Sequence, residues 1–123
     1  MGSARDTVNH FYALSNQQAA GLPAMRALIT DDIILEGPLN RTSGAEAYVA
    51  VLEQLLPAHV EYRIHRQFEE DDQVCSIYDL LLKAPSGQTI ALPMVDWITL
   101  RGGRIAVQKL YYDSRELMLA FGM

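Results

Sequence analysis

The spacing of apolar residues changes once along this chain, close to His59. Before that point, apolar side chains such as Val8, Phe11 and Tyr12 recur at the intervals of a helix face. From His59 to Tyr112, apolar and polar residues mostly alternate, which is typical of strands with one buried face and one wet face. Helices followed by consecutive strands favour an α+β architecture, in which a sheet packs against a layer of helices.

Three helices are expected in the first half of the chain. The first ends near Gly21, and a short second helix covers residues 23–30 and opens on a proline. The third begins at Ser43, because Ser43 and Glu46 have the spacing of a capping box, and it ends at a proline. Between the second and third helices, residues 33–35 predict a short strand.

The second half predicts an antiparallel meander. Charged or glycine-containing turns separate four strands, which we expect at residues 59–68, 74–83, 88–100 and 105–112. A last short helix at residues 115–121 would be capped by Asp113 or Ser114. We therefore expect a cone-shaped, curved antiparallel sheet that packs on three N-terminal helices and leaves a space between the two layers.

Composition limits the class of protein. A chain of 123 residues with 50% hydrophobic residues has the size and core of one domain, which we place at residues 1–123. The net charge of -5 argues against a nucleic-acid or anionic-membrane partner, because both require clustered positive charge. No apolar run is long enough to span a membrane, and the first residues lack the apolar region of a signal peptide.

The cysteine and histidine content points to the same class. A single cysteine, Cys75, excludes an internal disulfide and favours a reducing compartment, so we expect a cytoplasmic location. His59 and His65 fall on the polar side of their expected strand, and no other histidine or cysteine lies at ligand spacing. We therefore expect no metal and no cofactor.

Asp96 is the most unusual residue of the second half, because it interrupts the apolar run from Ile90 to Leu100. On a regular strand its side chain shares a face with Leu92 and Met94. Burying an unpartnered carboxylate costs several kcal/mol, so such a group is normally hydrogen-bonded, paired or neutralised. Asp96 is therefore the first candidate for a polar group on a cavity wall, the alternative being a carboxylate satisfied by neighbours without any chemistry.

Several segments, taken in order, carry a family resemblance. They are Phe11-Tyr12-Ala13-Leu14, the segment from Thr30 to Pro38, Ser43-Gly44-Ala45-Glu46, and Gly103-Arg104-Ile105 leading to Leu110-Tyr111-Tyr112-Asp113. In this respect the chain resembles the nuclear transport factor 2-like (NTF2-like) superfamily, and within it the SnoaL-like, ketosteroid-isomerase-like and limonene-epoxide-hydrolase-like proteins. The resemblance implies a conical α+β fold with an apolar cavity that binds a small hydrophobic molecule, often in a homodimer.

The catalytic positions of these families match only in part. Asp96 looks like the protonated acid of ketosteroid isomerases, which is also a well-known case of a neutral buried carboxyl. The proton-moving acid of that site would fall at Gly37, and its tyrosine near Phe11, with Tyr12 or His10 close by. Compared with limonene epoxide hydrolases, Asp79 matches one acid, but hydrophobic residues stand at the arginine and second acid positions, which are Ile77 and Leu110.

Asp96 and Asp79 are the expected catalytic pair. The turn at residues 85–87 could pair the two strands so that both acids face one cavity. In that case the two pKa values would move apart, and the acids would form a proton donor and acceptor pair. A register shifted by one residue would separate them. The expected ligand-binding residues are three tyrosines, which could equally be core residues, and three apolar side chains: Tyr12, Tyr48, Tyr111, Ile77, Leu92 and Met94.

Two functions follow as hypotheses. In the first, the cone binds a small apolar ligand, and any catalysis is cofactor-free acid/base chemistry of the isomerase, cyclase or lactone/epoxide hydrolase type. In the second, the chain is a non-catalytic assembly module whose cavity is filled by its own side chains. Trp97 lies on the strand face opposite Asp96, so we expect it in a homodimer interface formed by the sheet.

Overall fold

The computed structural model describes residues 3–123, so Met1 and Gly2 of the expected domain lie outside the described residues. Its helices, in chain order, are α1 (Ala4–Ser15), the 3₁₀ turn η1 (Gln18–Gly21), α2 (Leu22–Arg26), α3 (Ala45–Leu55), the 3₁₀ turn η2 (Leu56–Ala58) and α4 (Ser114–Phe121). Its strands are β1 (Ile29–Glu36), β2 (Arg41–Ser43), β3 (His59–Glu70), β4 (Gln73–Lys83), β5 (Thr89–Arg101) and β6 (Arg104–Tyr112). The α+β prediction is confirmed.

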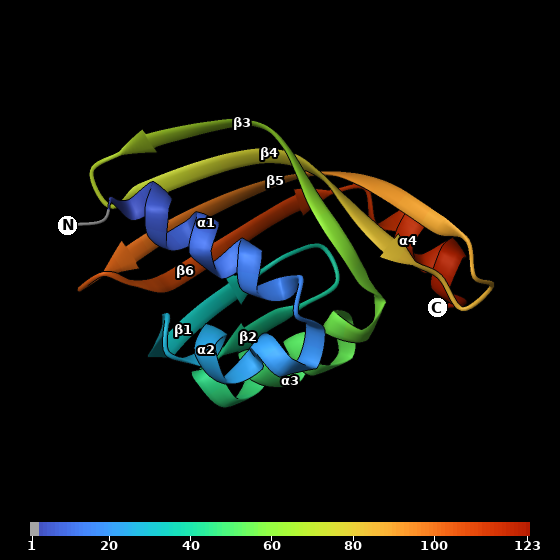
Figure 1. The fold of residues 1–123 in the computed structure, drawn as a ribbon, viewed down its shortest axis with the longest axis horizontal. Helices are drawn as coiled ribbons and strands as arrows, with labels where there is room; N and C mark the ends of the chain where they lie inside the picture. Colours follow the sequence, from blue (N-terminus) through green and yellow to red (C-terminus); the bar gives the residue numbers. More distant parts are fainter. Residues whose placement is uncertain (1–2) are drawn as a thin grey trace.

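The strands form one curved, unclosed sheet in the order β2-β1-β6-β5-β4-β3. Strands β3 to β6 make the predicted antiparallel meander. Strand β1 joins it through a parallel pairing with β6, in which Ile34 lies opposite Val107. In Figure 1, α1 runs along the concave side of the meander, and α2 and α3 lie with β1 and β2 below it. The sheet thus covers the three N-terminal helices, as the pattern predicted.

The second and third helices begin and end differently from the prediction. Ile29 pairs with Ile105, and the Ile105 N–H donates to the carbonyl oxygen of Leu28 over 2.8 Å, so residues 29 and 30 belong to β1. The predicted helix at residues 23–30 is accordingly shortened. Ser43 ends β2 and does not cap α3, because Gly44 takes the N-cap position with a φ of 97° that favours glycine.

A capping box does occur at the start of α1. The Ser3 Oγ accepts a hydrogen bond from the Asp6 N–H over 3.1 Å, and the Asp6 carboxylate accepts one from the Ser3 N–H over 3.2 Å. At the other end of the chain, Asp113 caps α4 as predicted, by accepting from the Arg115 N–H. Within residues 3–123, no helix combines the length and apolar character that crossing a bilayer requires.

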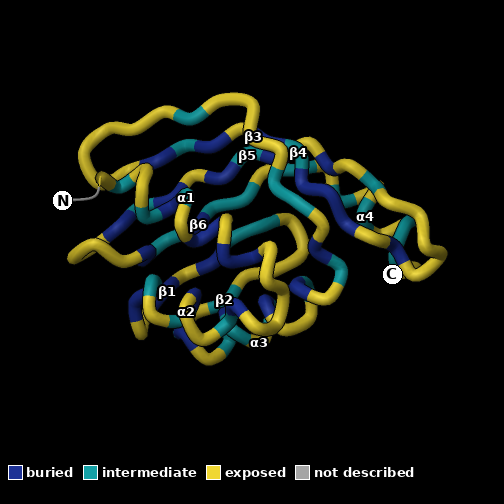
Figure 2. The backbone as a smooth tube through the Cα atoms, in the orientation of Figure 1, coloured by how far each residue is buried: buried dark blue, intermediate teal, exposed yellow. Residues whose placement is uncertain are grey.

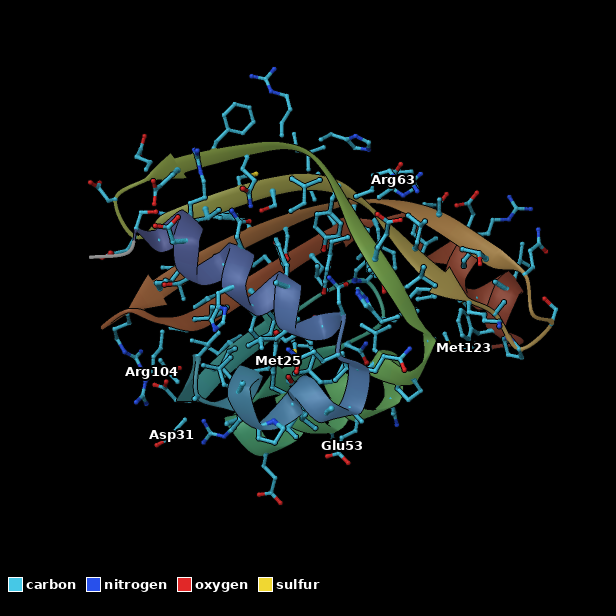
Figure 3. The ribbon with its side chains drawn as sticks, in the orientation of Figure 1. Met25, Asp31, Glu53, Arg63, Arg104 and Met123 are labelled. Atoms are coloured by element: carbon cyan, nitrogen blue, oxygen red, sulfur yellow. The ribbon has the colours of Figure 1, made fainter. Side chains whose placement is uncertain are left out.

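The core lies between the concave face of the sheet and the helices. Buried and exposed residues alternate along β5 and β4, as Figure 2 shows in the banding of the central strands. Figure 3 labels Met25 within this layer, where it is fully buried, whereas Asp31 and Glu53 point outward. Tyr78, Phe11 and Ile98 are among the largest side chains enclosed there. Most of the space between the two layers is therefore filled.

Strand β3 is the outermost strand at one side of the sheet. Its pairing with β4 is interrupted twice, between His59 and Glu61 and between Ile64 and Arg66. Such bulges bend a strand and increase its twist. Both occur in the part of β3 that follows η2, and Figure 1 shows that the strand is bent along its length.

Candidate functional site

Asp96 is enclosed completely, with 0% of its surface exposed. Strand β5 turns it toward the helices together with Met94 and Ile98, and its neighbours across the sheet are Ser76 on β4 and Leu110 on β6. The expected face of Asp96 is therefore the one that the structure shows. No basic side chain bonds to it among the described residues, so hydrogen bonds must offset the loss of hydration.

Neutral donors supply those hydrogen bonds. The Tyr12 hydroxyl donates to Oδ2 of Asp96 over 2.7 Å, and the Tyr78 hydroxyl donates to the same oxygen over a longer 3.4 Å. The side-chain amide of Gln108 donates to both oxygens, over 2.9 Å to Oδ1 and 3.0 Å to Oδ2. The donors come from α1, β4 and β6, so the carboxylate ties the first helix to the sheet.

A second layer orients these donors. The Oε1 of Gln108 accepts a hydrogen bond from the Tyr48 hydroxyl on α3, which fixes the amide so that its Nε2 faces Asp96. Tyr62 of β3 stacks on Tyr12, with ring centroids 4.4 Å apart, and meets Tyr78 edge-on at 5.1 Å. The polar network therefore lies inside a cluster of aromatic rings.

Burial dominates the titration of this network. It raises the pKa of Asp96 to about 6, although the hydrogen bonds from Tyr12, Gln108 and Tyr78 lower it again in part. Asp96 is consequently protonated more readily than an exposed carboxyl. Burial, followed by the nearby Asp96 charge, raises the pKa of Tyr12 and of Tyr78 well above the ordinary value. The two hydroxyls therefore remain protonated donors.

A small cavity of about 50 Å³ adjoins the network. Its walls are mainly tyrosines and aliphatic side chains, with one amide: Phe11, Leu35, Tyr48, Val51, Leu52, Leu55, Tyr62, Tyr78, Leu80, Met94, Gln108 and Leu110. Asp96 and Tyr12 lie behind this wall. Small-molecule sites usually enclose roughly 300–1,000 Å³, so a ligand of that class requires side chains to move.

The expected site residues divide between the two faces of the sheet. Tyr12, Tyr48, Leu92 and Met94 are buried on the concave side, and Tyr48 and Met94 line the cavity. Ile77 and Tyr111 lie on the convex face, because their cross-strand partner is Val95, a neighbour of the inward-facing Asp96 in β5. These two side chains therefore cannot reach the cavity.

Asp79 also lies on the convex face. It is paired with Pro93 and Arg63, and its Oδ2 lies 3.2 Å from Nε2 of His65. The partner of Asp96 on β4 is Ser76, so the register separates the two acids that we expected to share a cavity. The expectation of a paired carboxylate site is therefore not met by the geometry.

The sequence did not predict Gln108 and Tyr78 as members of the network. For Tyr78 it indicated only a strand face shared with Val74, Ser76 and Leu80. The position of Gln108 could not be read from its strand, because the partners that make it useful lie on α3 and β5. In the described part of the chain, no cluster of three acidic, histidine or cysteine side chains could hold a metal ion.

The convex face carries a patch of exposed apolar side chains, here called the outer patch. Neighbouring strands contribute Phe68, Ile77, Trp97 and Tyr111 around the half-buried Val95, with Ile34 of β1 further along. Trp97 is 41% exposed, and the Lys109 ammonium lies 5.0 Å from the centre of its ring. Trp97 therefore faces away from Asp96, as predicted.

Comparison with known proteins agrees with this fold. The sequence pattern of the SnoaL-like domain matches residues 8–108, while no curated protein matches the chain significantly. An NTF2-like protein of unknown function from Cytophaga hutchinsonii is 26% identical over 96% of both chains, with a TM-score of 0.81. A proposed SnoaL-like polyketide cyclase from Jannaschia sp. is 21% identical over 96% of this chain and 90% of its own, with a TM-score of 0.82. TerC, co-crystallised with polyporic acid, is 14% identical over 98% of both chains, with a TM-score of 0.79.

Proposed function

The chain belongs to the SnoaL-like domain family of the NTF2-like superfamily, and from this premise we propose that it is one cytosolic domain that binds a small, mainly apolar molecule. The ligand carries an oxygen that enters the inner end of the cone. The fold is shared with proposed polyketide cyclases and with TerC, which was crystallised with polyporic acid, and this supports the ligand class.

One observation carries the proposal. A fully buried carboxylate is held by neutral donors directly behind a cavity wall that contains Tyr48, Tyr78 and Gln108. A core that only needed to be stable would gain from an apolar residue at this position, because burying an unpaired charge costs free energy. The contact with the ligand oxygen falls to Tyr78 and Gln108, and Asp96 positions them.

The same arrangement supports acid/base chemistry of the cyclase or isomerase type. When Asp96 is protonated, it can donate to the Tyr78 oxygen while Tyr78 donates its own proton to the ligand oxygen. The ligand gains one proton, and Asp96 becomes a carboxylate stabilised by Tyr12 and Gln108. The proton returns by the reverse path when the product is released. Asp79 takes no part in this scheme, because it lies on the other face.

A ligand panel tests the proposal. We expect at least one member of a set of steroids, terpenoids, lactones and aromatic ketones to raise the melting temperature saturably. Tyr78→Phe removes the hydroxyl that faces the cavity, so it should weaken binding about tenfold, the equivalent of one hydrogen bond. Thr89→Val, which removes a hydroxyl at an exposed position that does not line the cavity, is the control and should bind like the wild type. A panel without any hit would contradict ligand binding.

A second candidate function rests on the outer patch. We propose that the chain forms a homodimer through this face, either alongside ligand binding or as its main role in an assembly module. The filled core and the exposed Trp97, Tyr111 and Phe68 favour this candidate, because clustered exposed aromatics are typical of interfaces.

Replacing Trp97 tests the dimer. Each aromatic anchor of an interface contributes about 2 kcal/mol or more, and a two-fold interface contains every residue twice. Trp97→Arg also places a second cation beside Lys109, so the dissociation constant of the dimer should rise at least ~30-fold. Sedimentation equilibrium measures the effect, with Leu119→Arg, an exposed leucine of α4, as the control. A wild-type protein that stays monomeric at high micromolar concentration would rule the module out.

A further inference from the structure

A second, larger hollow lies next to the cavity on the outside of the molecule. This groove of about 420 Å³ is formed where β1 leads into its turn and where β6 ends. Its lining combines small residues, two tyrosines and two oppositely charged side chains: Glu36, Gly37, Pro38, Lys109, Leu110, Tyr111 and Tyr112. The groove reaches the lower end of the volume that small-molecule sites usually enclose.

One side chain belongs to both hollows. Leu110 lines the outer groove and also the inner cavity, and no other residue between Ser3 and Met123 lines both. It faces the same side of β6 as Gln108 and is the cross-strand neighbour of Asp96. Leu110 therefore borders the groove on one side and, on the other, the cavity whose wall carries Gln108 and Tyr48.

Gly37 faces this leucine from the turn after β1. A Cβ atom at position 37 would lie 3.4 Å from Cβ of Leu110 and 3.8 Å from its Cδ1. The Gly37 N–H donates to the carbonyl oxygen of Asn40 over 2.7 Å, which holds the turn in place. Because glycine has no side chain, position 37 adds no Cβ atom against Leu110, whereas a side chain there would crowd the leucine.

We propose that Leu110 is the gate through which the ligand passes from the groove to the inner cavity. The body of the ligand lies against Pro38 and Tyr112, and its oxygen reaches Gln108 and Tyr78 once the leucine has moved. This inference rests on the ligand-binding function proposed above.

The surroundings define the ligand class. At the inner end the groups that meet the ligand are an amide and hydroxyls, which are uncharged and accept or donate hydrogen bonds. At the outer end Glu36 and Lys109 carry opposite charges, and the Glu36 carboxylate lies 3.4 Å from the Arg41 guanidinium. A neutral, flat ring that bears a hydroxyl or a ketone oxygen fits these groups, whereas a charged ligand would lose hydration without a partner ion.

Binding of 2-naphthol, followed by stopped-flow fluorescence, tests the gate. Leu110→Ala should increase the association rate constant at least tenfold, because the obstacle is removed. Gly37→Val should reduce it at least tenfold without altering the core, because the added methyl groups hold Leu110 against the cavity. Leu39→Ala, a neighbouring exposed leucine that lines neither hollow, is the control, and circular dichroism checks that each variant is folded.

The outcomes separate the gate from the function. Binding by Leu110→Ala that is faster than wild-type binding, or that occurs where the wild type shows none, supports the gate. Association rates within twofold of the wild type in both Leu110→Ala and Gly37→Val overturn the gate while ligand binding stands. If neither the wild type nor Leu110→Ala binds 2-naphthol or any member of the ligand panel, the gate and the proposed function both fail.

Discussion

Replacing Gln108 by leucine is expected to destabilise the protein by about 3–5 kcal/mol at pH 7, because it breaks the network at both ends. Asp96 loses the amide that donates to both of its oxygens, and a hydrogen bond to a charged group contributes about 1.5–3 kcal/mol. The Tyr48 hydroxyl loses its acceptor and remains buried, which costs about 1–3 kcal/mol more. Urea unfolding followed by circular dichroism measures the change.

The surface offers a matched control. Gln88→Leu makes the same exchange at an exposed position of the turn before β5, so its effect should stay within about 0.5 kcal/mol. The loss in Gln108→Leu should also shrink at pH 4, where Asp96 is neutral and needs fewer donors. A destabilisation below about 1 kcal/mol at pH 7 would show that the network contributes little to the fold.

The second large effect is a fall in stability between about pH 4 and pH 6 that depends on Asp96. The folded state raises the pKa of Asp96 from 3.8 to about 6, so it holds the proton more tightly than the unfolded chain does. The stabilisation from this proton is complete below the unfolded pKa and is lost as the pH rises through the folded pKa. With about 1.4 kcal/mol for each pH unit, the loss amounts to roughly 3 kcal/mol.

Asp96→Asn isolates this effect. The asparagine amide can donate to Gln108 if the Gln108 amide turns over and Tyr48 becomes an acceptor, so the fold should persist. Relative to the wild type, the variant should gain roughly 3 kcal/mol in free energy of unfolding between pH 4 and pH 7. Groups such as Asp31, Asp32 and His59 are common to both proteins and cancel in the difference. A difference that stays flat with pH would contradict the raised pKa of Asp96.

The face of β5 that carries Asp96 could be predicted from the sequence because side chains alternate regularly along the whole strand. Asp96 therefore falls with Leu92, Met94 and Ile98, which are buried in the core. The cap of α4 at Asp113 was predictable for a similar local reason, since its side chain reaches only two residues along the chain.

The placement of Asp79 could not be predicted in the same way. Strand β4 has apolar residues on both faces, with Ile77 and Leu81 on the convex side and Leu80 and Leu82 on the concave side. The pattern alone therefore did not identify the face that meets Asp96. The turn decides it, because hydrogen bonds of Ala84 to Gln88 and Gly87 set the register.

The network around Asp96 was predictable only in its first member. A buried carboxylate must find donors, and Tyr12 was one of several tyrosines that could supply them. The choice of Gln108 and Tyr78 depends on the alignment of three strands, which is a property of the packed sheet. At Ser43 the capping-box pattern predicted a helix start that the structure does not have. Gly44, with a positive φ, takes the N-cap position of α3 instead.

The two interruptions in β3 bear on how the molecule resists aggregation. As the last strand of an open sheet, β3 has a row of backbone amides and carbonyls without a partner strand, and such a row is a template for strand addition by another chain. The bulges break its regular spacing, and Arg63, His65 and Arg66 place polar, mostly cationic groups beside it. Another copy is thereby discouraged from extending the sheet into a fibre.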